Sequence, residues 1–177
     1  MKTRRSPLAC LVVCGLYATL SVARAPAAPP DEVTFNGPAS SPISAAVAIP
    51  AGRALFLTSG TVPPVVDEKA PAGDPARFGD TQTQGAGALR QIETRLKEAG
   101  LTLKDVVYLR VYVAADKTKD GKFDYQGWFD AYAKFFGTAE NPVKPARSTV
   151  GVASLVNADW LIEIEAVAVY PAASAPR

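Results

Sequence analysis

The sequence contains no histidine, and its only two cysteines, Cys10 and Cys14, lie near the N-terminus. Without histidine, the Ser-His-Asp and Cys-His arrangements of nucleophilic catalysis are excluded, and so is an ordinary zinc site. The Walker loop and the dinucleotide-binding glycine fingerprint are also missing. We therefore expect no metal and no cofactor. Arginine, carboxylates, tyrosine, hydroxyls, main-chain groups and water remain, a set that suits anion binding and water activation on a substrate that is already reactive.

The first 25 residues have the pattern of a secretory signal peptide. Basic residues precede a short apolar run over residues 8–22, and small residues stand at Ala23 and Ala25. Cleavage after Ala25 would remove both cysteines, so no disulfide is expected. It would also remove four basic residues and no acidic one, which moves the net charge from +2 to about −2. We therefore expect a periplasmic or secreted protein that has no nucleic-acid partner and no membrane attachment after processing.

The remaining chain is predicted to form a single domain. Residues 26–41 are rich in proline, show no hydrophobic period and predict a flexible linker or arm. The roughly 150 residues that remain after cleavage are a normal size for one domain with one core. We place the domain at residues 42–171 and a C-terminal tail at residues 172–177.

Hydrophobic periodicity divides this domain into strands and helices. Two short apolar runs around a Pro-Ala-Gly turn, residues 43–49 and 54–60, predict a hairpin. Leu89, Ile92 and Leu96 at helical spacing predict a helix that begins at residue 80 or 81 and ends at Ala99. The other predicted elements are strands at residues 106–113, 145–153 and 161–169, a helix at residues 123–136, and loops at residues 62–79 and 114–122.

The order of these elements indicates an α+β fold in which two helices cover one face of a mixed sheet. The opposite face would carry apolar and aromatic side chains, namely Tyr108, Tyr112, Leu161, Val167 and Val169. A half-apolar face left open to solvent needs a partner. A symmetric homo-oligomer is the simplest solution.

The last two predicted strands carry the candidate chemistry. Alternation in the final strand gives it one wholly apolar face and places Glu163 and Glu165 on the other. Arg147 heads the preceding strand. If both strands belong to one sheet, Arg147 and one glutamate could line a common pocket, with an anion clamp beside a potential base. The alternative is a solvated sheet face, where alternating glutamates are common.

Seven motifs occur in order along residues 42–169. They are Thr58-Ser59-Gly60, Gln84 with Ala88-Leu89 and Ile92, Ala99-Gly100-Leu101, Asp105-Val106-Val107, Tyr132 with Phe135-Phe136, Pro145-Ala146-Arg147-Ser148-Thr149-Val150, and Ile162-Glu163-Ile164-Glu165-Ala166-Val167-Ala168. Together they resemble the RidA/YjgF family of reactive intermediate deaminases.

The resemblance implies a homotrimer of chorismate-mutase-like α+β subunits with clefts between the subunits. It also implies hydrolysis of small 2-imino or enamino acids to 2-oxo acids and ammonia. By the same resemblance, Arg147 binds the substrate carboxylate, Glu163 positions or activates water, and main-chain groups of Thr149 and Gly60 line the pocket. At Ile43, where many members of the family have a tyrosine, this chain lacks the hydroxyl.

Two other functions stay open from the sequence. A non-catalytic trimer that binds small carboxylates, or that protects other proteins, agrees with the missing hydroxyl at Ile43. Ribonuclease activity, which has been attached to some relatives, is disfavoured because the processed chain is slightly acidic and has no basic stripe.

Overall fold

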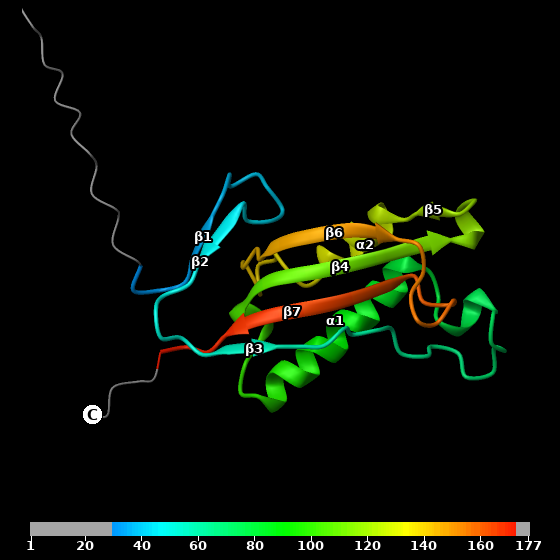
Figure 1. The fold of residues 1–177 in the computed structure, drawn as a ribbon, viewed down its shortest axis with the longest axis horizontal. Helices are drawn as coiled ribbons and strands as arrows, with labels where there is room; N and C mark the ends of the chain where they lie inside the picture. Colours follow the sequence, from blue (N-terminus) through cyan, green and yellow to red (C-terminus); the bar gives the residue numbers. More distant parts are fainter. Residues whose placement is uncertain (1–29, 173–177) are drawn as a thin grey trace, which may run out of the picture.

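The structure is a computed structural model that describes residues 30–172 (Figure 1). The predicted signal peptide, the start of the predicted arm and residues 173–177 of the tail lie outside the described residues. No helix between residues 30 and 172 is long and apolar enough to cross a membrane.

The main sheet is mixed, as the sequence predicts. Its strands lie side by side in the order β3 (Leu55–Leu57), β7 (Ile162–Val169), β4 (Val106–Asp116) and β6 (Ala146–Val152). The β3–β7 and β7–β4 pairs are antiparallel, whereas β4 and β6 are parallel. A two-residue strand, β5 (Lys122–Phe123), pairs with the C-terminal end of β4. Strands β3 and β6 therefore form opposite edges of this four-strand order.

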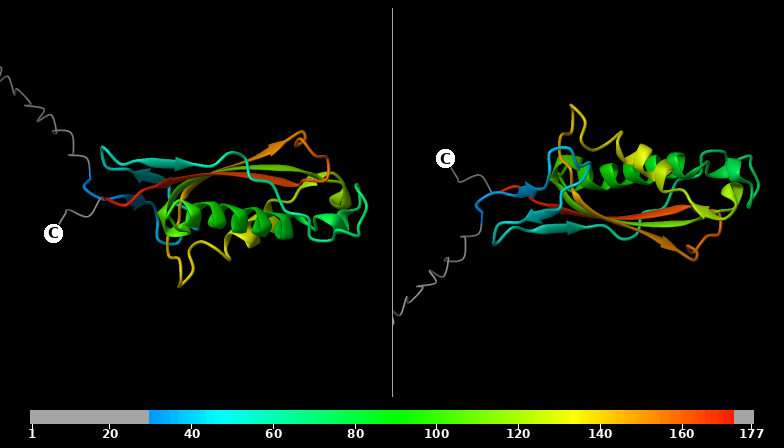
Figure 2. Two further views of the ribbon diagram at one scale, coloured as in Figure 1. Left: turned by 90° about the horizontal axis from the view of Figure 1, so that it is seen from below. Right: turned by 90° about the horizontal axis from the view of Figure 1, so that it is seen from above.

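Both helices lie on the same face of the sheet, which confirms the predicted α+β arrangement (Figure 2). The first, α1 (Thr81–Glu98), begins where the Asp80 carboxylate accepts a hydrogen bond from the Thr83 main-chain nitrogen. The second, α2 (Tyr125–Tyr132), is capped in the same way by Asp124. It is shorter than the predicted helix because Phe123 belongs to β5 and the chain turns after Tyr132.

The core fills the space between the helices and the sheet. The apolar face of β7 is buried there, as predicted, and meets the side chains that α1 and α2 present at helical spacing. The largest fully buried side chains include Leu89, Ile92, Leu96, Leu109, Trp128, Ile162 and Ile164. Within residues 30–172, no helix covers the other face of the sheet.

The predicted hairpin of residues 43–49 and 54–60 does not form. Instead β2 (Ala46–Ala48) pairs with β1 (Thr34–Asn36), a strand inside the predicted flexible arm, and β3 pairs with β7. Gly37 permits this because its main chain passes so close to Ala45 that a side chain there would crowd the Ala45 nitrogen. Periodicity identified β2 and β3 but not β1, and it contained no information about which strands pair.

Strand β4 is also longer than the prediction, which ended it at Val113 and placed a loop over residues 114–122. The structure continues β4 to Asp116 because other strands pair with its last residues. Ala114 pairs with Val152 of β6, and Asp116 pairs with Lys122 of β5. Alanine and aspartate have little strand preference of their own, so tertiary pairing decides the conformation here.

Replacing Ile164 by alanine is expected to lower the free energy of unfolding by about 2–5 kcal/mol, because it leaves a cavity in the core. Ile164 is 0% exposed, whereas Val156 is 95% exposed and provides the matched control. The Val156→Ala change is expected to stay within about 0.5 kcal/mol of wild type. Urea unfolding at one fixed protein concentration measures both, and equal losses would contradict the position of the core.

Candidate functional site

Arg147 lies on the helix-covered side of the sheet. Its partner in β4 is Leu109, which is fully buried against the helices, and residues opposite each other in paired strands share a face. The guanidinium carbon lies 4.4 Å from the centre of the Tyr132 ring, 4.9 Å from that of Phe129 and 5.5 Å from that of Trp128. The cation is therefore held in a cage of aromatic side chains from α2.

The described residues do not provide a hydrogen-bond acceptor for every nitrogen of the Arg147 guanidinium. Its Nη1 nitrogen is buried and has no hydrogen-bond partner among the described residues. Burial lowers the pKa of Arg147 from its ordinary value, although arginine retains its charge at neutral pH. A buried donor without an acceptor is costly, so this nitrogen favours an anionic ligand.

A pocket of about 480 Å³ opens beside Arg147. Its walls come from residues 40–42 of the arm, from the aromatic side chains Phe129, Tyr132 and Phe136, and from two cationic residues, Lys144 and Arg147. No acidic residue of the described chain lines it. The pocket therefore combines apolar walls with uncompensated positive charge, a combination that suits small organic anions.

Tyr132 connects this pocket to the arm. Its hydroxyl donates a hydrogen bond of 3.1 Å to the Pro42 carbonyl oxygen, and its ring stacks on Phe136 with 5.0 Å between centroids. Burial raises the pKa of Tyr132 to about 12, so the phenol is neutral at physiological pH. It can therefore support the Arg147 cation only through its ring.

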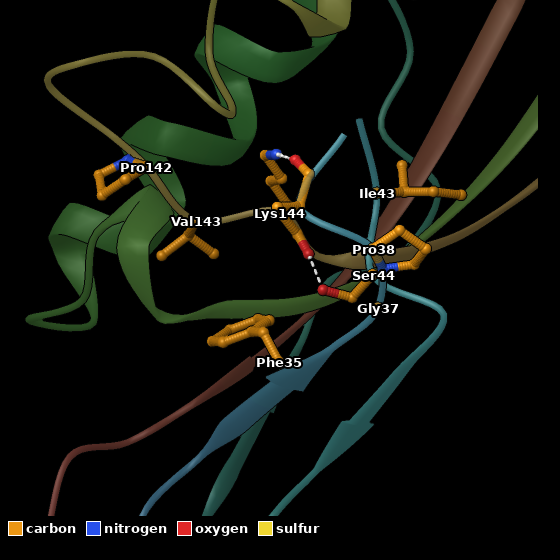
Figure 3. Close-up of a pocket in the computed structure, with 9 residues that line it drawn as sticks. Phe35, Gly37, Pro38, Ile43, Ser44, Pro142, Val143 and Lys144 are labelled. Carbon is orange, nitrogen blue, oxygen red and sulfur yellow. Dashed lines mark hydrogen bonds between the residues drawn. The ribbon is translucent and has the colours of Figure 1, made fainter. Parts of the chain in front are cut away.

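Ile43 lies next to this pocket but lines a different one. The second pocket, about 300 Å³ in volume, is formed by β1, the residues that follow it and residues 142–144, and Figure 3 shows its lining. Lys144 borders both pockets. The Ile43 side chain also packs against the hydrophobic core.

Glu163 lies on the open face of the sheet. It pairs with Tyr112 of β4, one residue out of phase with the buried positions Val111 and Val113. Its carboxylate packs directly on Gly60, where a side chain would overlap with the glutamate oxygens. Thr61, the next residue, exchanges two main-chain hydrogen bonds of 2.8 and 3.0 Å with Ile164, which fixes the turn against β7.

Within one subunit Arg147 and Glu163 do not share a pocket, contrary to the sequence-based hypothesis. Strand β4 separates β6 from β7, and the two side chains point to opposite faces of the sheet. The expectation drawn from the resemblance, that the clefts lie between subunits, stays a prediction. Residues 30–172 give Glu163 no ion pair and no hydrogen bond through its carboxylate.

The other two candidate residues, Glu165 and Thr149, each form hydrogen bonds with neighbouring side chains. Glu165 forms a salt bridge of 3.2 Å with Arg110 and accepts a hydrogen bond of 3.3 Å from the Tyr112 hydroxyl. Its negative charge is therefore paired within the subunit, on the open face. Thr149 faces the helices, and its hydroxyl accepts a 3.3 Å hydrogen bond from the indole nitrogen of Trp128. It lies on the same face as Arg147.

Sequence reasoning missed the aromatic cage and Lys144. Packing against the core accounts for the fully buried Trp128 but not for Phe129, which is 39% exposed. The available signal was the excess of large aromatic side chains in residues 123–136 over what one helix face can bury. Lys144 carried no signal of its own.

The comparisons with known proteins identify the family. The family model described as Endoribonuclease L-PSP matches residues 36–170. A RutC family protein of Pyrococcus horikoshii is 38% identical over 138 residues, which cover 77% of this chain and 96% of the relative. A Salmonella typhimurium protein named 2-iminobutanoate/2-iminopropanoate deaminase is 37% identical over 115 residues, 65% of this chain and 79% of that protein.

A solved structure has the same fold. The YjgF gene product from E. coli is 32% identical, covers 70% of this chain and 85% of its own, and superposes with a TM-score of 0.51. The chain therefore belongs to the Endoribonuclease L-PSP family, the group of RidA, YjgF and RutC proteins. The family expected from the motifs is confirmed.

Replacing Gly60 by alanine is expected to destabilise the protein by about 0.5–1 kcal/mol, because the new methyl group displaces the Glu163 carboxylate, the end of a flexible side chain, from its position on Gly60. In a Glu163→Ala background the same change should cost less, with a coupling of about 0.5 kcal/mol, the low end for residues in contact. Urea unfolding of the four proteins measures the cycle, with Ser59→Ala as the control. Equal costs in both backgrounds would contradict the contact.

Proposed function

We propose that the protein hydrolyses reactive 2-imino and enamino acids to 2-oxo acids and ammonia. The observation that carries this proposal is the half-buried guanidinium of Arg147 at the wall of an open pocket, with its buried Nη1 nitrogen lacking an acceptor. A carboxylate is the group whose two oxygens match the guanidinium fork. Arg147 therefore binds the substrate carboxylate and fixes the adjacent carbon.

The magnitudes favour a ligand at this position. Moving a cation out of water costs several kcal/mol even after relaxation. Each aromatic face returns about 0.5–2 kcal/mol, but the three rings around Arg147 provide no hydrogen-bond acceptor for its unpaired Nη1 nitrogen. A bound carboxylate would supply the missing charge and hydrogen bonds.

The chemistry itself needs few groups. A protonated imine is already electrophilic, so water adds to its carbon while a carboxylate takes up the proton of the water. The protonated carboxylate then returns this proton to the nitrogen of the carbinolamine. The carbon–nitrogen bond breaks, ammonia leaves, and loss of the hydroxyl proton to the carboxylate or to ammonia gives the 2-oxo acid. In our proposal Glu163 positions the water and accepts its proton, and main-chain groups of Gly60 and Thr149 orient the substrate. No covalent intermediate with the protein is required.

The complete site needs two subunits in this proposal. Arg147 lies on the edge strand β6, whereas Gly60 follows β3 at the opposite edge and touches Glu163. A head-to-tail ring places the β6 edge of one copy beside the β3 edge of the next and so completes one site at every contact. The exposed Leu55 and Leu57, 48% and 65% accessible on the open face, support such a contact. We propose a ring of three copies, as the family resemblance implies.

The relative from Salmonella typhimurium supports the reaction class, because its name specifies 2-iminobutanoate and 2-iminopropanoate as substrates. Its similarity to this chain covers 65% of the present sequence.

Arg147→Ala is expected to reduce kcat/KM for 2-iminobutanoate by at least about tenfold, because it removes a charge-assisted hydrogen bond to the substrate. The imine is generated in situ by an amino-acid oxidase, and its disappearance is measured in competition with semicarbazide. Arg90→Ala, an exposed arginine on α1, is the matched control and should retain wild-type activity. A folded wild-type protein that leaves the imine lifetime unchanged would refute the deaminase.

Mixing two inactive variants tests the shared site. Arg147→Ala and Glu163→Gln subunits, unfolded together and refolded in equal amounts, should regain about one quarter of wild-type activity, because one contact in four unites both intact residues. Each variant refolded alone is the control. A site built within one subunit would give no recovery, so inactivity of the mixture would sink the two-subunit arrangement.

A non-catalytic carboxylate-binding module is the second candidate. It is favoured by Ile43, which places an apolar side chain where many members of the family carry a tyrosine hydroxyl. This alternative predicts that 2-oxo acids bind at Arg147 while imine lifetimes stay unchanged. The semicarbazide measurement above separates it from the deaminase.

A further inference from the structure

The pocket beside Arg147 contains a second fixed cation. The Lys144 ammonium donates hydrogen bonds to the Ala39 carbonyl oxygen at 2.8 Å and to the Ser41 carbonyl oxygen at 3.0 Å. These two contacts hold the side chain in place at the junction of the arm and the pocket. One of its three N–H groups remains free for a ligand.

The charges of this pocket are unbalanced. Neither Lys144 nor Arg147 takes part in an ion pair within residues 30–172, and the pocket lining includes no carboxylate. A 2-imino monocarboxylic acid with a protonated imine is electrically neutral and leaves both cations uncompensated overall. A dicarboxylic acid carries the additional negative charge that such a site favours.

The dimensions of the pocket agree with a substrate that has a functional group at each end. Its volume of about 480 Å³ lies within the range of small-molecule sites, about 300–1,000 Å³. Arg147 lines it from β6, Lys144 lines it from the segment before that strand, and aromatic side chains of α2 and of the turn that follows it form the rest of its apolar wall. The aromatic walls then contact the carbon chain between the two carboxylates.

We propose that this pocket selects dicarboxylic 2-imino acids and the corresponding 2-oxo acids. The carboxylate beside the imine binds Arg147, and the distal carboxylate binds Lys144, which is the specificity-determining residue. The hydrolysis of such substrates rests on the proposed deaminase function. The preference for dicarboxylates as ligands does not, because it follows from the pocket alone.

The test compares 2-oxoglutarate with 2-oxopentanoate, two ligands of equal chain length that differ by the distal carboxylate. Isothermal titration of the full chain gives both dissociation constants. Wild type is expected to bind 2-oxoglutarate at least about tenfold more tightly. Lys144→Gln should abolish this ratio, Lys144→Arg should retain it, and Lys134→Gln, an exposed lysine beyond α2, should leave it unchanged.

The ratio of the two dissociation constants is the readout because Lys144 also holds the arm in place, so its replacement can affect the binding of any ligand in the pocket. Loosening of the arm alone would weaken both ligands equally and leave the ratio intact. A wild-type ratio near one, a ratio that survives in Lys144→Gln, or tighter binding of 2-oxo-4-phenylbutanoate than of 2-oxoglutarate would overturn the proposal. The last outcome would indicate that the pocket selects substrates with an aromatic side chain.

Turnover separates this proposal from the deaminase function. The imines of glutamate and of 2-aminopentanoate are generated by amino-acid oxidases and followed with semicarbazide. A preference for 2-iminoglutarate that disappears in Lys144→Gln supports both the deaminase function and the selection of dicarboxylates by Lys144. Hydrolysis of neither imine by a protein that binds 2-oxoglutarate selectively refutes the deaminase and supports the dicarboxylate site.

Discussion

The register of β4 is the constraint on which the rest of the site depends. This strand pairs with β7 on one side and with β6 on the other, so it determines which face each of their side chains occupies. A slip of one residue in either pairing would move Arg147 or Glu163 to the opposite face. The buried residues Leu109, Val111 and Val113 resist such a slip, because it would expose them to water.

This register separates the surroundings of Arg147 from those of Glu163, and the two differ in physical character. The Arg147 side is an aromatic and cationic pocket in which the buried Nη1 nitrogen lacks an acceptor. The Glu163 side is an open turn in which the carboxylate lies against the bare main chain of Gly60. In the proposed deaminase the Arg147 side binds the substrate carboxylate, and the Glu163 side positions the water that attacks the imine.

Much of this protein was predictable because local patterns reflect burial. Alternation in residues 161–169 identified β7 and its apolar face, and helical spacing with an Asp80 cap identified α1 to within a residue at each end. Pairing was not predictable, because a short strand such as residues 55–57 matches any neighbour of similar polarity. The β1–β2 pair and the last three residues of β4 exist through partners far away in the sequence.

The sequence by itself determined the α+β class, the family and the chemical inventory, because periodicity, motif order and the absence of histidine are properties of the chain alone. The export signal remains a prediction of the same kind, since residues 1–25 lie outside the described part. Only the tertiary structure decided that Arg147 and Glu163 lie on opposite faces and that Lys144 joins Arg147 in one pocket. The reason is that strand order, register and the course of the arm are set by contacts between distant segments, which no local pattern records.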